Sequence, residues 1–300
     1  MSLLVVGSIA YDTVETPYGN RNDSLGGSAL YFSAAASFFT PVNVVGVVGS
    51  DFDTSKISFL KKRGVNLDGM YVESGDTFRW GGRYHKDLNQ RDTLFTYLNV
   101  FENFQPKIPA KYKKADYVFL ANIDPELQLQ VLEQIDKPKL VVLDTMNFWI
   151  SGKRRTLEEV IKYCDILIVN DEETRELTDE PNLISAIRKL ASVEGPKTLI
   201  IKKGEHGAIL YHNEKYFFVP AFPLDKAVDP TGAGDSFAGG FLGYICRQDN
   251  IEANTLRKAV VYGSAVASYT VEDFSFDRLQ ALTNEELDER FKSFKDLTNF

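Results

Sequence analysis

The chain has 300 residues, 44% apolar and 25% charged, and this balance excludes an intrinsically disordered or collagen-like protein. Its 34 basic and 42 acidic side chains give a net charge of -8, which argues against a nucleic-acid binder, because such proteins need cations facing the phosphates. The two cysteines, Cys164 and Cys246, form no C-x-x-C pair. We therefore expect neither a disulfide framework nor a thiolate zinc site, and a reducing, cytoplasmic location.

The first part of the chain predicts a parallel sheet. Residues 3–7 form a short apolar run ending in glycine, as expected for a strand covered on both faces, and residues 28–39 suit a buried helix. Residues 42–48 predict a second buried strand, and residues 55–63 an amphipathic helix closed by Gly64. This alternation of strand and helix is typical of an α/β fold.

Residues 24–50 carry no charge over a length that could cross a bilayer. Four glycines, Pro41 and Asn43 interrupt this stretch, and no basic segment precedes it. We expect no membrane insertion.

Between about residues 69 and 101 the sequence becomes aromatic, partly alternating and poor in helix formers. Such a pattern predicts a small antiparallel sheet outside the parallel one. The parallel pattern then resumes, and no long linker or internal repeat divides the chain, so we expect one domain over residues 1–300. The remaining predicted elements are strands at 117–121, 139–143, 166–169 and 198–201, a hairpin at 207–219, and helices at 125–135, 157–163, within 172–191, and near 235–247, 254–269 and 284–296.

The most informative stretch is the glycine-rich segment 228–241. Gly232 and Gly234 allow a sharp turn that gathers several main-chain N–H groups just where a helix begins. A helix start offers unpaired donors and a partial positive charge, so we expect a phosphate-like ligand there. The segment matches neither the P-loop nor the G-x-G-x-x-G fingerprint.

Asp235 stands beside this predicted phosphate cradle, where a carboxylate would ordinarily repel the ligand. If a substrate hydroxyl lies between Asp235 and the terminal phosphate of a nucleotide, the carboxylate can take its proton while the amides of Gly232, Ala233 and Gly234 hold the growing charge. The structural alternative is that Asp235 only caps the helix and the glycines only shape a loop.

Residues 229–237, Asp-Pro-Thr-Gly-Ala-Gly-Asp-Ser-Phe, closely resemble the carboxy-terminal signature of the ribokinase-like, or PfkB, family of carbohydrate and nucleoside kinases. The resemblance extends over nearly the whole chain. Shorter matches are Asp12 after the first strand, the pair Gly26-Gly27, the N-x-x-E element from Asn170 to Glu173, and the turn from Lys203 to Gly207.

The resemblance implies a three-layer α/β/α fold with a mostly parallel central sheet and a small β-sheet lid, built from about residues 8–18 and 69–101. It also implies transfer of the γ-phosphoryl group of ATP, with magnesium, to a hydroxymethyl group. Asp235 would be the base, and Gly232, Ala233 and Gly234 would form the anion hole. A monovalent cation and a homodimer formed through the lid stay open.

The resemblance further implies roles for the shorter motifs. Asn170 and Glu173 would position magnesium through water molecules. The structural alternative is ordinary helix capping, with Asp171 as the cap. Lys203, Gly204, Gly207 and Thr231 would lie on the nucleotide side, and the adenine pocket near 202–207 and 259–267.

Asp12, Gly26 and Gly27 would bind the alcohol, with an Asx turn and a tight bend as the structural alternatives. Tyr31 occupies the position where many sugar kinases of this family carry an asparagine. A phenol ring cannot replace an amide, so ribose or fructose specificity does not carry over.

Three functional readings follow. The first is an ATP-dependent kinase for a neutral sugar or polyol. The second is a nucleoside kinase, in which Tyr31 or Phe78 stacks on the base. The third is a nucleotide sensor without turnover, which the presence of Asp235 argues against.

Overall fold

A nine-stranded sheet forms the centre of the computed structural model, which describes residues 1–299. Seven neighbouring strands are parallel, and the last two add an antiparallel edge. In spatial order the strands are β13 (Lys215–Val219), β12 (Ala208–His212), β11 (Thr198–Lys202), β10 (Ile166–Asn170), β9 (Leu140–Asp144), β8 (Tyr117–Leu120), β1 (Leu3–Val6), β4 (Val42–Gly49) and β5 (Val65–Glu73).

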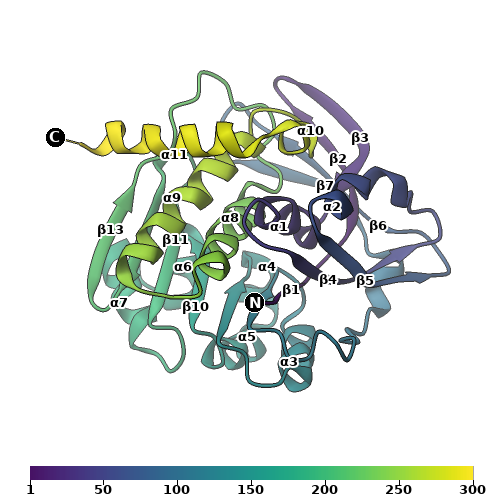
Figure 1. The fold of residues 1–300 in the computed structure, drawn as a ribbon, viewed down its shortest axis with the longest axis horizontal. Helices are drawn as coiled ribbons and strands as arrows, with labels where there is room; N and C mark the ends of the chain where they lie inside the picture. Colours follow the sequence, from purple (N-terminus) through teal and green to yellow (C-terminus); the bar gives the residue numbers. More distant parts are fainter. Residues whose placement is uncertain (300) are drawn as a thin grey trace.

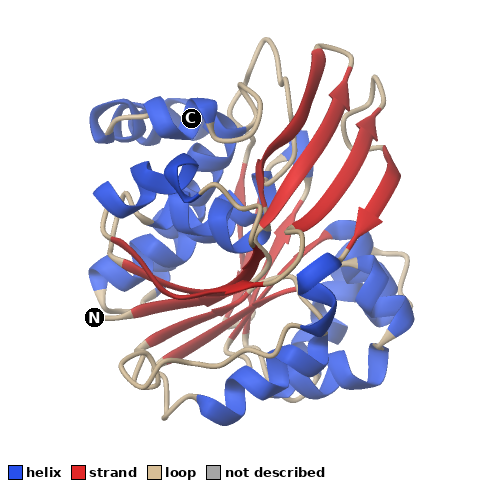
Figure 2. Cartoon of the chain, turned by 90° about the vertical axis from the view of Figure 1, so that its right-hand side faces the viewer, coloured by secondary structure: helices blue, strands red, loops and turns tan. Residues whose placement is uncertain are grey.

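Helices cover both faces of this sheet, which makes three layers (Figures 1 and 2). One face carries α1 (Ser28–Ala36), α2 (Ser58–Lys62), α8 (Ala233–Gln248), α9 (Ala253–Thr270), α10 (Asp277–Ala281) and α11 (Asn284–Thr298). The other carries α3 (Pro125–Gln134), α4 (Asn147–Gly152), α5 (Arg154–Lys162), α6 (Asp171–Thr178) and α7 (Leu183–Ser192).

The apolar strands follow from this two-sided burial. Successive side chains of a strand point to opposite faces, so Leu3 and Val5 belong to the apolar core that includes α1 and α8, while Leu4 and Val6 belong to the core on the other face, which includes α3 and α5. The predicted three-layer, mostly parallel fold is confirmed.

The second sheet has four strands in the order β3 (Gly19–Gly26), β2 (Ala10–Thr16), β6 (Phe78–Tyr84) and β7 (Arg91–Tyr97), and Figure 2 shows it rising from one end of the large sheet. Its boundaries differ from the expected 8–18 and 69–101. Residues 69–73 belong to β5 of the large sheet, and residues 19–26 form a strand that we did not expect. The polar run at 19–24 hid this strand, because its exposed face gives no apolar alternation.

Several helices also differ from expectation. The predicted helix at 55–63 consists of a 3₁₀ turn, η1 (Thr54–Ile57), followed by the short α2, with the side chain of Asp53 capping the first turn. The helices α4 and α10 were not expected, because five or six residues carry too little periodicity to be recognised. Two further 3₁₀ turns are η2 (Asn99–Asn103) and η3 (Gly204–His206).

The uncharged stretch 24–50 folds as the end of β3, the nine-residue α1 and β4. Within residues 1–299, none of the helices combines the length and the apolar character that a membrane crossing requires.

Candidate active site

Three polar side chains end three adjacent parallel strands. Asp144 is the last residue of β9, Asn170 of β10 and Lys202 of β11, and the pairing places Asn170 beside Lys202. In open α/β sheets ligands bind at the carboxyl ends of the strands, so this edge is the expected place for a site. The amino-terminal end of α8 lies against the same edge, because Gly234 in its first turn meets the Lys202 side chain.

The turn before α8 places main-chain donors at this edge. Gly232 is the N-cap residue with φ +75°, and a side chain there would lie 2.3 Å from the Tyr31 ring, so glycine is required. Within the described chain, the amides of Gly232 and Gly234 have no hydrogen-bond acceptor. The Ala233 amide, in contrast, donates to the carbonyl of Pro230 at 3.2 Å. The expected three-amide hole therefore has two free donors in this structure, since Ala233 closes the turn.

Asp229 fixes the turn from inside. Its carboxylate is buried and accepts the amides of Thr231 at 2.8 Å and Ser275 at 3.2 Å. The sequence alone assigns no role to Asp229, although it stands at the start of the glycine-rich motif. An aspartate two residues before a threonine amide is a turn signal that could have identified it.

Asp235 lies in the first turn of α8, half-buried, beside Asp144 and Lys202. Burial and the nearby Asp144 carboxylate raise its pKa to about 7, against the opposing charge of Lys202. A carboxylate that titrates near neutral pH is a more effective proton acceptor than an ordinary aspartate.

Lys202 enters the sequence analysis only as the first residue of the expected adenine pocket, and its place beside Asp235 is not predicted. Its ammonium donates to Asp144 Oδ1 at 3.1 Å and lies 3.0 Å from where a Cβ on Gly234 would be. A lysine directly after the apolar run of β11, at a position where strand ends carry ligand-binding groups, was the available signal.

Asn170 and Glu173 form a capping box at the start of α6. The Glu173 amide donates to Asn170 Oδ1 at 2.8 Å, and the Asn170 amide donates to Glu173 Oε2 at 2.7 Å. The cap is therefore Asn170 and not Asp171, as the structural alternative had supposed. Burial raises the pKa of Glu173 to about 7, and the Lys202 charge opposes this rise.

The donor set suits a magnesium ion held mainly by phosphates and water. Within residues 1–299, no three His, Cys, Asp or Glu side chains are grouped as direct metal ligands. The carboxyl groups of Glu173 and Asp235, whose pKa values are raised, would be ionised more readily beside a divalent cation. Mg²⁺ commonly keeps several waters and takes few protein ligands, which fits this arrangement.

Asp12 lies in β2 of the small sheet and faces the same region. It is buried, and burial together with the charges of Asp229 and Asp235 raises its pKa to about 8, while the Gly27 amide donates to it and opposes the rise. A Cβ on Gly26 would lie 1.9 Å from Asp12 Oδ2, so glycine is needed for this approach. Asp12 pairs with Ser24 of β3 within a sheet, which excludes the Asx turn.

Tyr31 is packed on both faces of its ring. Gly232 lies against one face, and the ring stacks on Phe276 with centroids 4.3 Å apart. The expectation that Tyr31 stacks on a nucleobase is therefore wrong, because no face is left for a base. Its hydroxyl lies near Asp12, Asp229 and Tyr84, on the side of the ring edge that faces the small sheet. The Phe78 ring stacks on Phe101.

The small sheet contacts the loops at the edge of the large sheet, across the site. Thr231 Oγ1 donates to the hydroxyl of Tyr84 at 3.1 Å, and the side chain of Asn89 lies over Gly204. Burial raises the pKa values of Asp235 and Glu173, and the charge of Arg91 at the start of β7 opposes both rises, which places this guanidinium near the two carboxyls.

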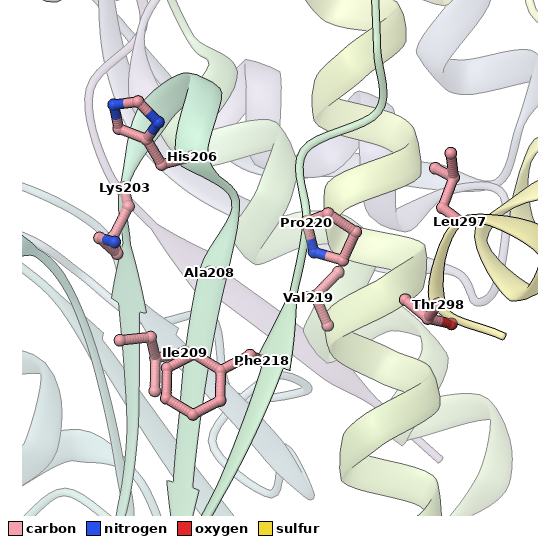
Figure 3. A pocket seen from close by; sticks show the side chains of 9 residues that line it. All are labelled: Lys203, His206, Ala208, Ile209, Phe218, Val219, Pro220, Leu297 and Thr298. Carbon is pink, nitrogen blue, oxygen red and sulfur yellow. The ribbon is translucent and has the colours of Figure 1, made fainter. Parts of the chain in front are cut away.

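A cavity lies beside the turn after β11. Lys203 donates its amide to the Gly207 carbonyl at 2.8 Å, and Gly204 and Gly207 both have positive φ. The cavity has a volume of about 330 Å³, and Phe218 at its edge is 59% exposed. Figure 3 shows Lys203 and His206 at one end of this cavity, with Leu297 and Thr298 of α11 across from them.

Comparisons with known proteins identify the family of the chain. Residues 2–278 match the pfkB family carbohydrate kinases. The cytidine kinase of Thermococcus kodakarensis is 30% identical over 259 residues, which cover 84% of this chain and 91% of that protein.

Two solved structures share the fold. The Burkholderia thailandensis nucleoside kinase in complex with inosine has a TM-score of 0.79 and 21% identity, with 97% of this chain and 98% of that chain covered. An E. coli protein described as a ribokinase II, in complex with ATP and Mg²⁺, has a TM-score of 0.78 and 20% identity, with coverage of 97% and 99%.

The family match spans most of the chain, and the large and small sheets have the arrangement found in these kinases. The protein therefore belongs to the pfkB family of carbohydrate and nucleoside kinases, which are phosphotransferases acting on hydroxyl groups.

Proposed function

We propose that this protein transfers the γ-phosphoryl group of ATP to the hydroxymethyl group of a nucleoside. The observation that carries the proposal is the meeting of Asp235 with the free amides of Gly232 and Gly234 at the start of α8. The relatives named cytidine kinase and nucleoside kinase favour a nucleoside over the neutral sugar or polyol that the sequence alone put first.

The chemistry needs one base and one anion site. The Asp235 carboxylate takes the proton of the substrate hydroxyl as its oxygen attacks the γ-phosphorus. The amides of Gly232 and Gly234 donate to the transferred group, whose charge the partial positive end of α8 also stabilises. Asn170 and Glu173 would hold a magnesium ion through water, and such an ion would supply positive charge opposite the phosphates.

Charge is divided across the site in a way that suits a neutral acceptor. Asp12 lies toward the proposed alcohol side, where its largely protonated carboxyl group would exchange hydrogen bonds with hydroxyls and offer no positive charge to an anion. Asp229 lies on the same side, with its carboxylate held by the amides of Thr231 and Ser275. Lys202 lies on the proposed phosphate side. Gly26 allows the Asp12 carboxyl group, and Gly27 the main chain of Ser8 and Ile9, to approach closely, so these glycines would act on the alcohol by positioning Asp12.

The small sheet acts as a lid in this proposal, and residues 1–299 work as a single kinase unit. By closing over the alcohol it would exclude water, which competes as a phosphoryl acceptor. The cavity beside Lys203, Gly204 and Gly207 would take the adenine end of ATP, with Phe218 as an apolar wall. Thr231, which holds Tyr84, would link nucleotide and lid.

A neutral sugar or polyol is the second candidate acceptor. The observation that favours it is the packing of Tyr31, whose ring has no free face for a nucleobase. A smaller acceptor needs only the hydroxyl-binding groups Asp12 and Tyr31.

The test is a coupled ADP-release assay with ATP and Mg²⁺ on cytidine, inosine, other nucleosides, neutral sugars and polyols, followed by ³¹P NMR of the product. We expect the highest kcat/KM for a nucleoside, with phosphate on the hydroxymethyl oxygen. Turnover of sugars or polyols alone would contradict the nucleoside assignment. Nucleotide binding without turnover of any alcohol would contradict the kinase proposal and support the sensor.

A further inference from the structure

Lys202 has donors that the protein does not use. Within residues 1–299 its ammonium has one hydrogen-bond acceptor, Asp144 Oδ1 at 3.1 Å, and an ammonium carries three N–H groups. The side chain is 19% exposed, so the remaining donors have little access to bulk water. A partly satisfied cation at a ligand-binding edge is suited to an anionic ligand.

The ammonium also lies directly at the proposed anion site. Its nitrogen is 3.0 Å from where a Cβ of Gly234 would be, and the Gly234 amide is one of the two free donors. A ligand that accepts this amide therefore lies next to the ammonium. Gly234 leaves room for the lysine side chain, since a larger residue would press on it.

Asp144 fixes the ammonium in place. Asp144 ends β9, two strands from β11, and is 4% exposed, so its carboxylate reaches Lys202 across the end of β10. The pairing fixes the Lys202 ammonium in a region that also contains Asp235 and Glu173. A charged group at this depth requires a close partner of opposite charge, because a lone buried charge is costly.

We propose that Lys202 contacts the γ-phosphoryl group during transfer and stabilises its charge, with Asp144 as the positioning residue. This inference rests on the proposed kinase function. In the step, the substrate oxygen forms a bond to the γ-phosphorus while the bond from that phosphorus to the β,γ-bridging oxygen breaks. The bond pair leaves with ADP, the hydroxyl proton goes to Asp235, and Lys202 remains protonated throughout.

If Lys202 had a purely structural role, it would only neutralise the charge of Asp144. A double variant distinguishes this role from contact with the γ-phosphoryl group, because the two roles predict different activities. Lys202→Met alone leaves the Asp144 charge buried without a partner and lowers stability under either role. Lys202→Met combined with Asp144→Asn removes both charges and should recover stability, but only a structural role predicts that activity recovers too.

The experiment compares wild type, K202M, K202M/D144N and K202R, with K153M as the matched control. Lys153 also pairs with carboxylates, Asp124 at 2.7 Å and Glu126 at 3.0 Å, but it lies outside the site. Calorimetry measures the affinities for ATP and for ADP with Mg²⁺, thermal unfolding measures Tm, and the coupled assay measures kcat and KM for the alcohol.

We expect the double variant to regain the Tm of wild type while its kcat stays lower by about 10²- to 10³-fold, as for loss of one charge-stabilising donor. Its ATP affinity should fall more than its ADP affinity, because only ATP carries the γ-phosphate, while KM for the alcohol stays near wild type. K202R should recover part of kcat, and K153M should match wild type.

Recovery of kcat in the double variant, or equal losses of ATP and ADP affinity, would overturn the role of Lys202. Failure of the kinase function itself has a different signature, which is absence of turnover by the wild type. In that case the ATP-to-ADP affinity ratio still decides whether Lys202 contacts the γ-phosphate.

Discussion

Asp235 combines two features, a position beside unpaired amide donors and a pKa suited to accepting a proton. Its burial and the Asp144 carboxylate raise the pKa to about 7, while Lys202 limits the rise. The same residues thus shape the base and the charge of the phosphate side. At this scale the chemistry depends on neighbouring charges more than on any single group.

The pH dependence of turnover follows from this pKa. The base must be ionised, so kcat/KM should increase about tenfold per pH unit below pH 7 and level off above it. Steady-state kinetics from pH 5.5 to 9 checks this, with ATP affinity measured by calorimetry over the same range as the control. A rate that is flat down to pH 5.5, with unchanged affinity, would contradict the assignment of Asp235 as the base.

Asp12 should affect stability in a pH-dependent way. Its pKa is raised from 3.8 to about 8 in the folded protein, mainly by burial, so between these values the folded chain keeps a proton that the unfolded chain releases. Asp12 therefore lowers stability increasingly as pH rises through this range. Asparagine has no such proton and can still accept the Gly27 amide.

We expect Asp12→Asn to raise Tm relative to wild type, with a gap that widens from pH 5 to pH 8. Thermal unfolding at several pH values measures the gap, and calorimetry should show weaker alcohol binding with ATP affinity retained. A gap that is constant with pH would show that Asp12 titrates as an ordinary exposed aspartate.

At the scale of elements, the site forms where strand ends, a helix start and the small sheet meet. The ends of β9, β10 and β11 supply Asp144, Asn170 and Lys202, and α8 supplies Asp235. The small sheet adds Asp12, and the hydroxyl of Tyr84 connects this sheet to Thr231. Contacts between these elements set the geometry.

Weakening the lid contact should uncouple ATP hydrolysis from transfer. Tyr84→Phe removes the hydroxyl that accepts from Thr231, so the lid should exclude water less completely. We expect the ratio of alcohol-independent ATP hydrolysis to transfer to rise several-fold, measured as phosphate release with and without alcohol.

Tyr18→Phe is the matched control, because Tyr18 follows β2 in the same sheet and its side chain is exposed. It should leave the ratio unchanged. An unchanged ratio in Tyr84→Phe as well would contradict a role of this contact in excluding water.

The elements that the sequence predicted correctly are those with long apolar runs or a specific motif. The parallel strands could be found because both faces are buried, and α8 because glycines and Asp235 mark its start. Strand β3 could not, because its polar residues 19–24 gain their pairing from β2 and not from burial of their own. Short helices such as α10 depend in the same way on tertiary packing.

At the scale of the whole molecule, the sequence could not predict which distant residues contact the motifs. Spacing along the chain does not show that Lys202 meets Gly234, that Ala233 closes its own turn, or that Phe276 covers Tyr31. Each of these contacts joins segments far apart in sequence or depends on one dihedral angle. The family resemblance gave the fold and the reaction, while the lid-mediated homodimer stays a prediction.

The central claim is that Asp235 accepts the proton at an anion site made by the start of α8. The most direct measurement compares wild type and Asp235→Asn for single-turnover phosphoryl transfer to the best alcohol, alongside calorimetric ATP affinity and Tm. We predict a loss of transfer of about 10³-fold, within the range for a general base, with ATP affinity and Tm equal to or above those of wild type. Transfer by Asp235→Asn at a rate within a few-fold of wild type would contradict the account.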